Sequence, residues 1–219
     1  MKSTFIKTAV GALALCSAMV TGPVFANSIS FDKSWKEQGL LRLFGNEYAL
    51  KGRSLGVSSD GTVSVIWRPV DAGLRQAKRA SWNWAVQEGV APTDLTRKGG
   101  DDRNLALYFV FLDPQSADNL SRTSARKLLR NPNTRALVYV WGGDHARGDL
   151  LRSPYSAGLR TKIMRTNAQG SFSENVDLAA DYRRAFDGEA GVLVGLAITA
   201  DSDDTKGRIR ATLSDLTLK

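Results

Sequence analysis

The feature that most constrains the fold is the even spread of β-strand-like segments along the chain. Residues 62–67 are β-branched and aromatic and follow an Asp-Gly turn pair. Residues 79–86 alternate between apolar and polar side chains, which predicts a strand with one buried face. Residues 105–112 are apolar on both faces, which is typical of a strand buried on both sides. Further strands are predicted over residues 136–141, 159–166, 171–176, 192–199 and 208–218.

Two stretches have a helical period instead. Residues 117–129 carry apolar side chains on one side and basic ones on the other. Residues 178–186 repeat apolar side chains every fourth position, and Asp177 is placed to cap the start. A doubly wound α/β fold would need a helix after most strands. The pattern therefore predicts a mainly all-β protein, an antiparallel β-sandwich of jelly-roll type with one or two short helices.

Residues 1–26 resemble a secretory signal peptide. Two lysines precede an apolar run over residues 9–20, and small residues at Val24 and Ala26 match the positions that a signal peptidase recognises. The run is too short to cross a bilayer, so we expect no transmembrane segment. Cleavage is expected before Asn27. This predicts a single β-sandwich domain over residues 27–219 that is periplasmic or secreted.

Composition excludes several classes of site. The one cysteine, Cys16, lies within the signal segment, so the mature chain has neither disulfides nor a thiolate zinc site. The single histidine, His145, lies in a polar loop and is expected to be solvated. The net charge of +8 comes from scattered basic residues, without a basic stripe or a known module. We therefore expect no nucleic-acid partner.

Two acidic loops flank the predicted strands. Asp101 and Asp102 precede the strand at 105–112, and Asp201 and Asp203 follow the strand at 192–199. If these two strands are antiparallel neighbours, the loops share one edge of the sandwich. Clustered carboxylates suit a hard cation, so these four residues are candidate calcium ligands. Ordinary turn hydrogen bonds, salt bridges with nearby arginines, and a catalytic carboxylate pair are the alternatives.

Three tryptophans are candidate ligand-binding residues. Trp82 and Trp84 lie two residues apart on one strand face, as a platform for stacking on a sugar ring would require, and Trp141 ends another strand. The alternative is that this face belongs to the core, because Val86 continues it.

Short motifs occur in a distinctive order from residue 35 to residue 219. They are Lys51-Gly52, Trp82-x-Trp84, Gly100-Asp101-Asp102, Tyr139-Val140-Trp141, Asp181-Tyr182-Arg183 and Asp201-Ser202-Asp203-Asp204-Thr205. In this ordered set the chain resembles the bacterial exported proteins of the domain of unknown function family 3047. The resemblance implies an exported, single-domain, β-rich protein, and it implies no activity because none is established for the family.

The function that the sequence favours is a non-catalytic periplasmic binding protein of β-sandwich type. Carbohydrate or another cell-envelope ligand is the expected target. One alternative is a glycan-active hydrolase or lyase that uses the Asp-rich loops. Another is an envelope protein-interaction module, which would show a contiguous exposed apolar patch. The chain contains no GxSxG, P-loop, Rossmann or HExxH motif.

Overall fold

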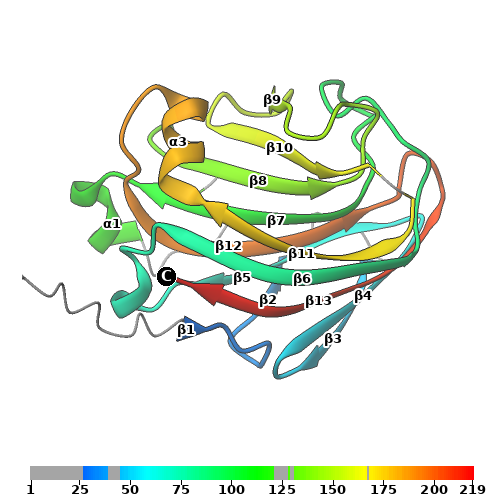
Figure 1. The fold of residues 1–219 in the computed structure, drawn as a ribbon, viewed down its shortest axis with the longest axis horizontal. Helices are drawn as coiled ribbons and strands as arrows, with labels where there is room; N and C mark the ends of the chain where they lie inside the picture. Colours follow the sequence, from blue (N-terminus) through cyan, green and yellow to red (C-terminus); the bar gives the residue numbers. More distant parts are fainter. Residues whose placement is uncertain (1–26, 39–44, 121–127, 129–130, 167) are drawn as a thin grey trace, which may run out of the picture.

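The structure is a computed structural model that describes residues 27–38, 45–120, 128, 131–166 and 168–219. Its strands form two stacked sheets (Figure 1). The smaller sheet has the order β11 (Gly170–Asp177), β6 (Arg79–Glu88), β13 (Arg208–Leu218), β4 (Ser54–Asp60) and β3 (Glu47–Lys51), and β1 (Asn27–Ser28) also pairs with β13. The larger sheet has the order β2 (Lys36–Gln38), β5 (Val63–Pro69), β12 (Val192–Asp201), β7 (Arg103–Leu112), β8 (Arg135–Trp141), β10 (Leu159–Arg165) and β9 (Leu150–Arg152).

The β-sandwich prediction is confirmed, and each predicted strand appears within a few residues of its expected limits. The condition for the two acidic loops to share an edge is met, because β7 and β12 are antiparallel neighbours. One pair departs from the antiparallel pattern: β10 runs parallel to β8. The connection between them includes β9, which pairs antiparallel with β10 at the sheet edge. The short edge strands β2 and β9 were not predicted, because three residues are too few to show an alternation of apolar and polar side chains.

The two sheets differ in how their faces are buried. In β6, buried and partly exposed residues alternate, so only the face toward the larger sheet is in the core. In β7 and β8 nearly every residue is buried. One set of their side chains joins the main core between the sheets. The other set packs on the outer face of the larger sheet against residues such as Leu95, Ala117 and Leu128.

The helices lie toward one end of the sandwich (Figure 1). The predicted helix over 178–186 is confirmed as α3 (Leu178–Phe186), and the Asp177 side chain accepts a hydrogen bond from the Ala180 amide at 2.9 Å. Figure 1 shows α3 across one end of the strands. The helix expected over 117–129 is represented by α1 (Pro114–Leu120), and most of its remainder lies outside the described residues. A short 3₁₀ helix, η1 (Ala72–Leu74), precedes β6.

The segment predicted as a signal peptide, residues 1–26, also lies outside the described residues. Within the part of the chain that the structure describes, no helix combines the length and apolar character that a membrane crossing needs.

The sugar-platform hypothesis for Trp82, Trp84 and Trp141 is wrong. Their exposed fractions are 1%, 1% and 0%, and all three lie in the core between the sheets. Trp84 packs edge-on against both of the others, with ring centroids 5.4 Å from Trp82 and 5.5 Å from Trp141. The alternation of β6 defined a common face correctly. That face is the core because the smaller sheet must bury one side against the larger sheet.

Candidate functional site

A cleft of about 650 Å³ lies on the outer face of the larger sheet. Its floor comes from outward side chains of β5, β12, β7, β8 and β10, and loop residues such as Leu95 and Tyr155 form its walls. We call it the outer cleft. Most of its lining is apolar, and its polar groups gather where β7 begins and β12 ends. The cleft exists because the outer face of this sheet is apolar and the loops cover it only in part.

The polar end unites the two acidic loops that the sequence singled out. Nη1 of Arg103 donates to the Asp101 backbone oxygen at 2.6 Å. The same nitrogen lies 3.2 Å from a carboxylate oxygen of Asp101 and 3.2 Å from one of Asp201. Because β7 and β12 are antiparallel, the start of one lies beside the end of the other. The expectation that the loops share one edge is therefore confirmed.

Arg103 is held as a cation within this cluster. Its side chain is largely buried, and Nη2 donates a 3.2 Å hydrogen bond to the Tyr108 hydroxyl. Burial alone would lower the pKa of Arg103, but the neighbouring Tyr108, Asp201 and Asp101 outweigh that effect and raise it. The guanidinium therefore stays charged and fixes the positions of two carboxylates that border the outer cleft.

Asp201 has the most perturbed carboxyl group of the cluster. Burial raises its pKa; Arg103 opposes this rise, while Asp203 and Asp102 add to it. Its oxygen Oδ1 is buried and has no hydrogen-bond donor among the described residues. The neighbouring carboxyl group of Asp203 is an acceptor when ionised, so the two bond only when one carries a proton. Asp201 thus retains its proton to higher pH than an ordinary aspartate.

The four candidate calcium ligands do not form one group. Asp101 is engaged by Arg103 and by the Tyr155 hydroxyl, which donates to it at 2.6 Å. Asp102 accepts hydrogen bonds from the Asp204 amide and from both the amide and hydroxyl of Thr205. Asp102, Asp203 and Asp204 do come together, with one oxygen of each within 4.8 Å of the others. Calcium binding by the four residues that the sequence indicated stays a prediction. The group in the structure differs from it, because Asp204 joins Asp102 and Asp203, whereas Asp101 and Asp201 contact Arg103.

The aromatic residues of the outer cleft are not the three that the sequence singled out. Tyr155 is 58% exposed, and Lys98 Nζ lies 5.7 Å from its ring centroid. Tyr108 and Trp67 lie deeper, and Trp67 packs its indole directly over Gly195. Strand 62–67 and strand 105–112 were both predicted, so their outward positions could have been named. The loop position of Tyr155 carries no periodicity that would reveal it.

Large exposed hydrophobic side chains are few in the described part of the chain. They are Leu50 on β3 and Tyr155 beside the larger sheet. These residues do not form the contiguous patch expected of an interaction module.

The fold and the cleft define a two-layer β-sandwich protein with a partly covered outer sheet face. The chain belongs to the family of proteins of unknown function DUF3047, whose model matches residues 33–217. No curated protein matches the chain.

Among solved structures the chain resembles the xyloglucanase domain of NopAA from Sinorhizobium fredii, at 9% identity and TM-score 0.46, covering 89% of this chain and 97% of that one. It also resembles the family 11 xylanase from Neocallimastix patriciarum, at 11% identity and TM-score 0.42, covering 89% and 100%. The adhesin domain of Lys-gingipain from Porphyromonas gingivalis has 15% identity and TM-score 0.42, covering 90% and 98%. Likenesses this distant say nothing about the function of this chain.

Proposed function

We propose that this protein binds a short carbohydrate in the outer cleft. The observation that carries the proposal is a cleft of about 650 Å³ with apolar walls and a few polar groups already fixed in place. Clefts of roughly 300–1,000 Å³ with this composition are where proteins bind small molecules. Arg103 and its two carboxylates supply the fixed polar end, and Tyr155 supplies an exposed ring at the wall.

The chemistry of the cleft suits a ring with apolar faces and polar edges. A sugar offers C–H faces to side chains such as Tyr155 and Val110, and hydroxyl groups to Asp101 and Arg103. The hydroxyls of such a ligand can donate to carboxylates and accept from the guanidinium. A purely apolar ligand would use none of these polar groups and would remove their remaining contact with water.

We propose in addition that the chain acts in the periplasm or outside the cell, so that a cell-envelope glycan is its ligand. This part depends on removal of residues 1–26, which the sequence predicts. Amino-terminal sequencing of the protein from a periplasmic extract should begin at Asn27. A chain that stays in the cytosol with residues 1–26 attached would contradict it.

Calorimetric titration with a panel of soluble di- and trisaccharides tests the binding proposal. At least one sugar should bind the wild-type protein, and Tyr155→Ala should weaken binding about 2- to 10-fold because a stacking ring is lost. Leu50→Ala is the matched control, since Leu50 is also an exposed hydrophobic residue but lies on the smaller sheet. No binding across the panel, or equal loss in both variants, would overturn the proposal.

A specific observation favours a second candidate, a glycan-active hydrolase. Asp201 keeps its proton because burial raises its pKa, which suits a general acid. Its Oδ2 and the Asp101 Oδ2 each lie 3.2 Å from one Arg103 nitrogen, so these oxygens cannot be farther apart than twice that distance. A neighbouring pair of carboxyl groups is what most glycoside hydrolases use.

Release of nitrophenol from a panel of nitrophenyl glycosides tests this candidate. Asp201→Asn and Asp101→Asn should each abolish release while circular dichroism shows that both variants keep the fold, and Asp60→Asn, at an exposed aspartate on β4, should not affect release. If no glycoside is cleaved but saccharides still bind, the protein is a binding protein only.

We also propose that calcium binds at Asp102, Asp203 and Asp204. The support is the approach of their oxygens to within 4.8 Å, which suits the 2.3–2.6 Å bonds of calcium. Calorimetry with CaCl₂ should show one site that Asp203→Asn and Asp204→Asn weaken and Asp60→Asn leaves unchanged. Absence of heat at millimolar calcium would remove this proposal and leave the carbohydrate proposal standing.

A further inference from the structure

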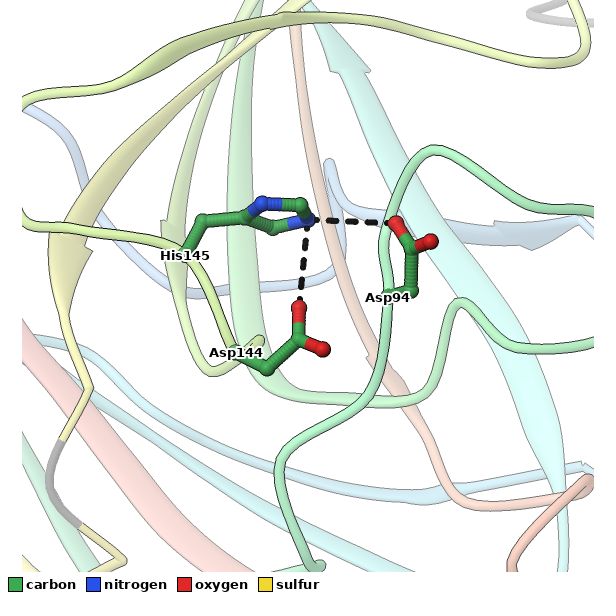
Figure 2. A group of neighbouring side chains, drawn as sticks. All are labelled: Asp94, Asp144 and His145. Atoms are coloured by element: carbon green, nitrogen blue, oxygen red, sulfur yellow. Dashed lines mark ion pairs between the residues drawn. The ribbon is translucent and has the colours of Figure 1, made fainter.

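A second polar cluster lies where two loops meet beside the outer cleft. Asp94 belongs to the segment between β6 and β7, while Asp144 and His145 follow β8. Nε2 of His145 lies 3.3 Å from Oδ1 of Asp94 and 3.4 Å from Oδ1 of Asp144. Figure 2 shows the two carboxylates directed at this single ring nitrogen.

Hydrogen bonding does not account for this arrangement. Nε2 of His145 is buried and has no hydrogen-bond partner of acceptable geometry in the described part of the chain. Bonds from a ring N–H to a carboxylate are normally about 2.7–3.0 Å long. A single N–H also cannot point along both directions to Asp94 and Asp144 at once.

The distances match those between ligands of a tetrahedral metal ion. Zinc binds imidazole nitrogen at about 2.0–2.1 Å and carboxylate oxygen at about 2.0–2.2 Å, so at tetrahedral angles two ligand atoms are about 3.4 Å apart. The two measured separations, 3.3 Å and 3.4 Å, have this value. The ligand atoms of all three residues lie within 4.8 Å of one another.

We propose that Asp94, Asp144 and His145 bind one divalent transition-metal ion of the zinc type. An imidazole nitrogen favours such an ion over calcium, which takes oxygen ligands. Three protein ligands leave a fourth position for water. All three side chains are partly exposed, so the ion has a route of entry from solvent.

Neighbouring hydrogen bonds already orient the proposed ligands. Oδ1 of Asp94 accepts from the amide of Thr96 at 3.0 Å and from its hydroxyl at 2.6 Å. The Asp144 amide donates to the Thr93 carbonyl oxygen at 2.9 Å. Contacts of this kind fix the direction of metal-binding carboxylates and hold the two loops together.

The site would stiffen one wall of the outer cleft. Leu95 follows Asp94 and lines the cleft, and Gly143 lies so close to it that a Cβ at Gly143 would come within 2.8 Å of Leu95. A metal ion that joins Asp94 to Asp144 and His145 would therefore hold Leu95 in place. This consequence rests on the proposed function, whereas metal binding itself does not.

Proton NMR of the mature protein tests the proposal with unusual selectivity, because His145 is the only histidine of the chain. Its imidazole C–H signals should shift on titration with ZnCl₂ and reach a plateau at one equivalent. CaCl₂ at the same concentration should not shift them. Zinc that binds without moving these signals, or signals that do not change at all, would overturn the proposal.

Calorimetry with ZnCl₂ on variants completes the test. Asp94→Asn, Asp144→Asn and His145→Ala should each weaken zinc binding at least 10-fold, whereas Asp60→Asn should not. Circular dichroism will identify a variant that fails to fold. Asp144→Asn is the variant most expected to fold, because Asp144 is the most exposed of the three residues. Undiminished binding in folded Asp144→Asn would overturn the proposal. Saccharide titration without zinc tests the proposed function separately.

Discussion

The outer faces of the two sheets differ in their exposure to solvent. On the smaller sheet the outward side chains are polar and bond across strands, as in the 2.7 Å hydrogen bond between Ser81 and Thr217. On the larger sheet they are apolar, and loops cover them except at the outer cleft. A sheet buried on both faces can build a cleft on the second face without disturbing the core, because the core needs only the first.

An aspartate–arginine pair on each outer face shows the effect of that difference. Asp215 pairs with Arg53 on the smaller sheet, and hydrogen bonds from Arg53 and Asn83 lower its pKa. Asp201 pairs with Arg103 on the larger sheet, yet burial raises its pKa. The aspartate pKa is therefore shifted down on the smaller sheet and up on the larger one. A strongly shifted pKa is typical of functional sites, and here it occurs on the covered face.

The largest expected loss of stability follows from a substitution in the core between the two sheets. Trp82→Ala should lower the free energy of unfolding by about 3–5 kcal/mol, because it leaves a cavity among Trp84, Phe109 and Tyr139. Urea denaturation measures this. Tyr155→Ala, on the exposed wall, should lower it by at most about 1 kcal/mol, because the hydrogen bond that its hydroxyl donates to Asp101 is exposed. Similar losses in both variants would contradict the division between core and cleft.

The second prediction compares the two arginines. Arg103→Ala should cost about 3 kcal/mol of unfolding free energy, because Asp101, Asp201 and Tyr108 lose the hydrogen bonds that the largely buried guanidinium makes with them. Arg53→Ala removes an exposed partner and should cost below about 1 kcal/mol. Urea denaturation at neutral pH compares the two. If the two variants lost equal free energy of unfolding, the covered face would weaken charge interactions as strongly as bulk water does.

Much of the sandwich could be predicted from the sequence because alternation and apolar runs specify strands locally. The meeting of the acidic loops followed from the sequence only on the condition that residues 105–112 pair with 192–199, and the structure supplies that pairing. Alternation could not say which face of Trp82 and Trp84 was solvent and which was core. The sequence predicted that residues 105–112 are buried on both sides. It could not show which residues cover the outer side, because these belong to loops far away in the sequence.

The candidate sites were predicted less completely for the same reason. Asp101 and Asp201 were correctly grouped, since strand order places them. The roles of Arg103 as the link, and of Tyr155 as the exposed ring, come from tertiary contacts across 98 and 54 residues of sequence. His145 was expected to be solvated because nothing local connects it with Asp94.

The third prediction tests how tightly the floor of the outer cleft is packed. Gly195→Ala would place a Cβ against the Trp67 indole, so we expect a loss of about 1–3 kcal/mol of unfolding free energy and a shift of tryptophan fluorescence. Gly56→Ala on the smaller sheet is the matched control, because its Cβ would make only a 3.4 Å contact with Ala49. A neutral Gly195→Ala would show that Trp67 can move aside.

The smallest expected effect concerns pH and the exposed pair. Because the pKa of Asp215 is lowered in the folded state, its ionised form stabilises the fold above its unfolded pKa of about 3.9, and this contribution is lost as pH falls through the folded pKa. Asp215→Asn should remove at most about 1 kcal/mol at pH 7 and almost nothing at pH 2. Asparagine also suits the backbone there, where φ is 54°. Urea denaturation at both pH values measures the difference. A cost that persists at pH 2 would show that Asp215 stabilises the fold through its hydrogen bonds to Asn83 and Ser214 rather than through its charge.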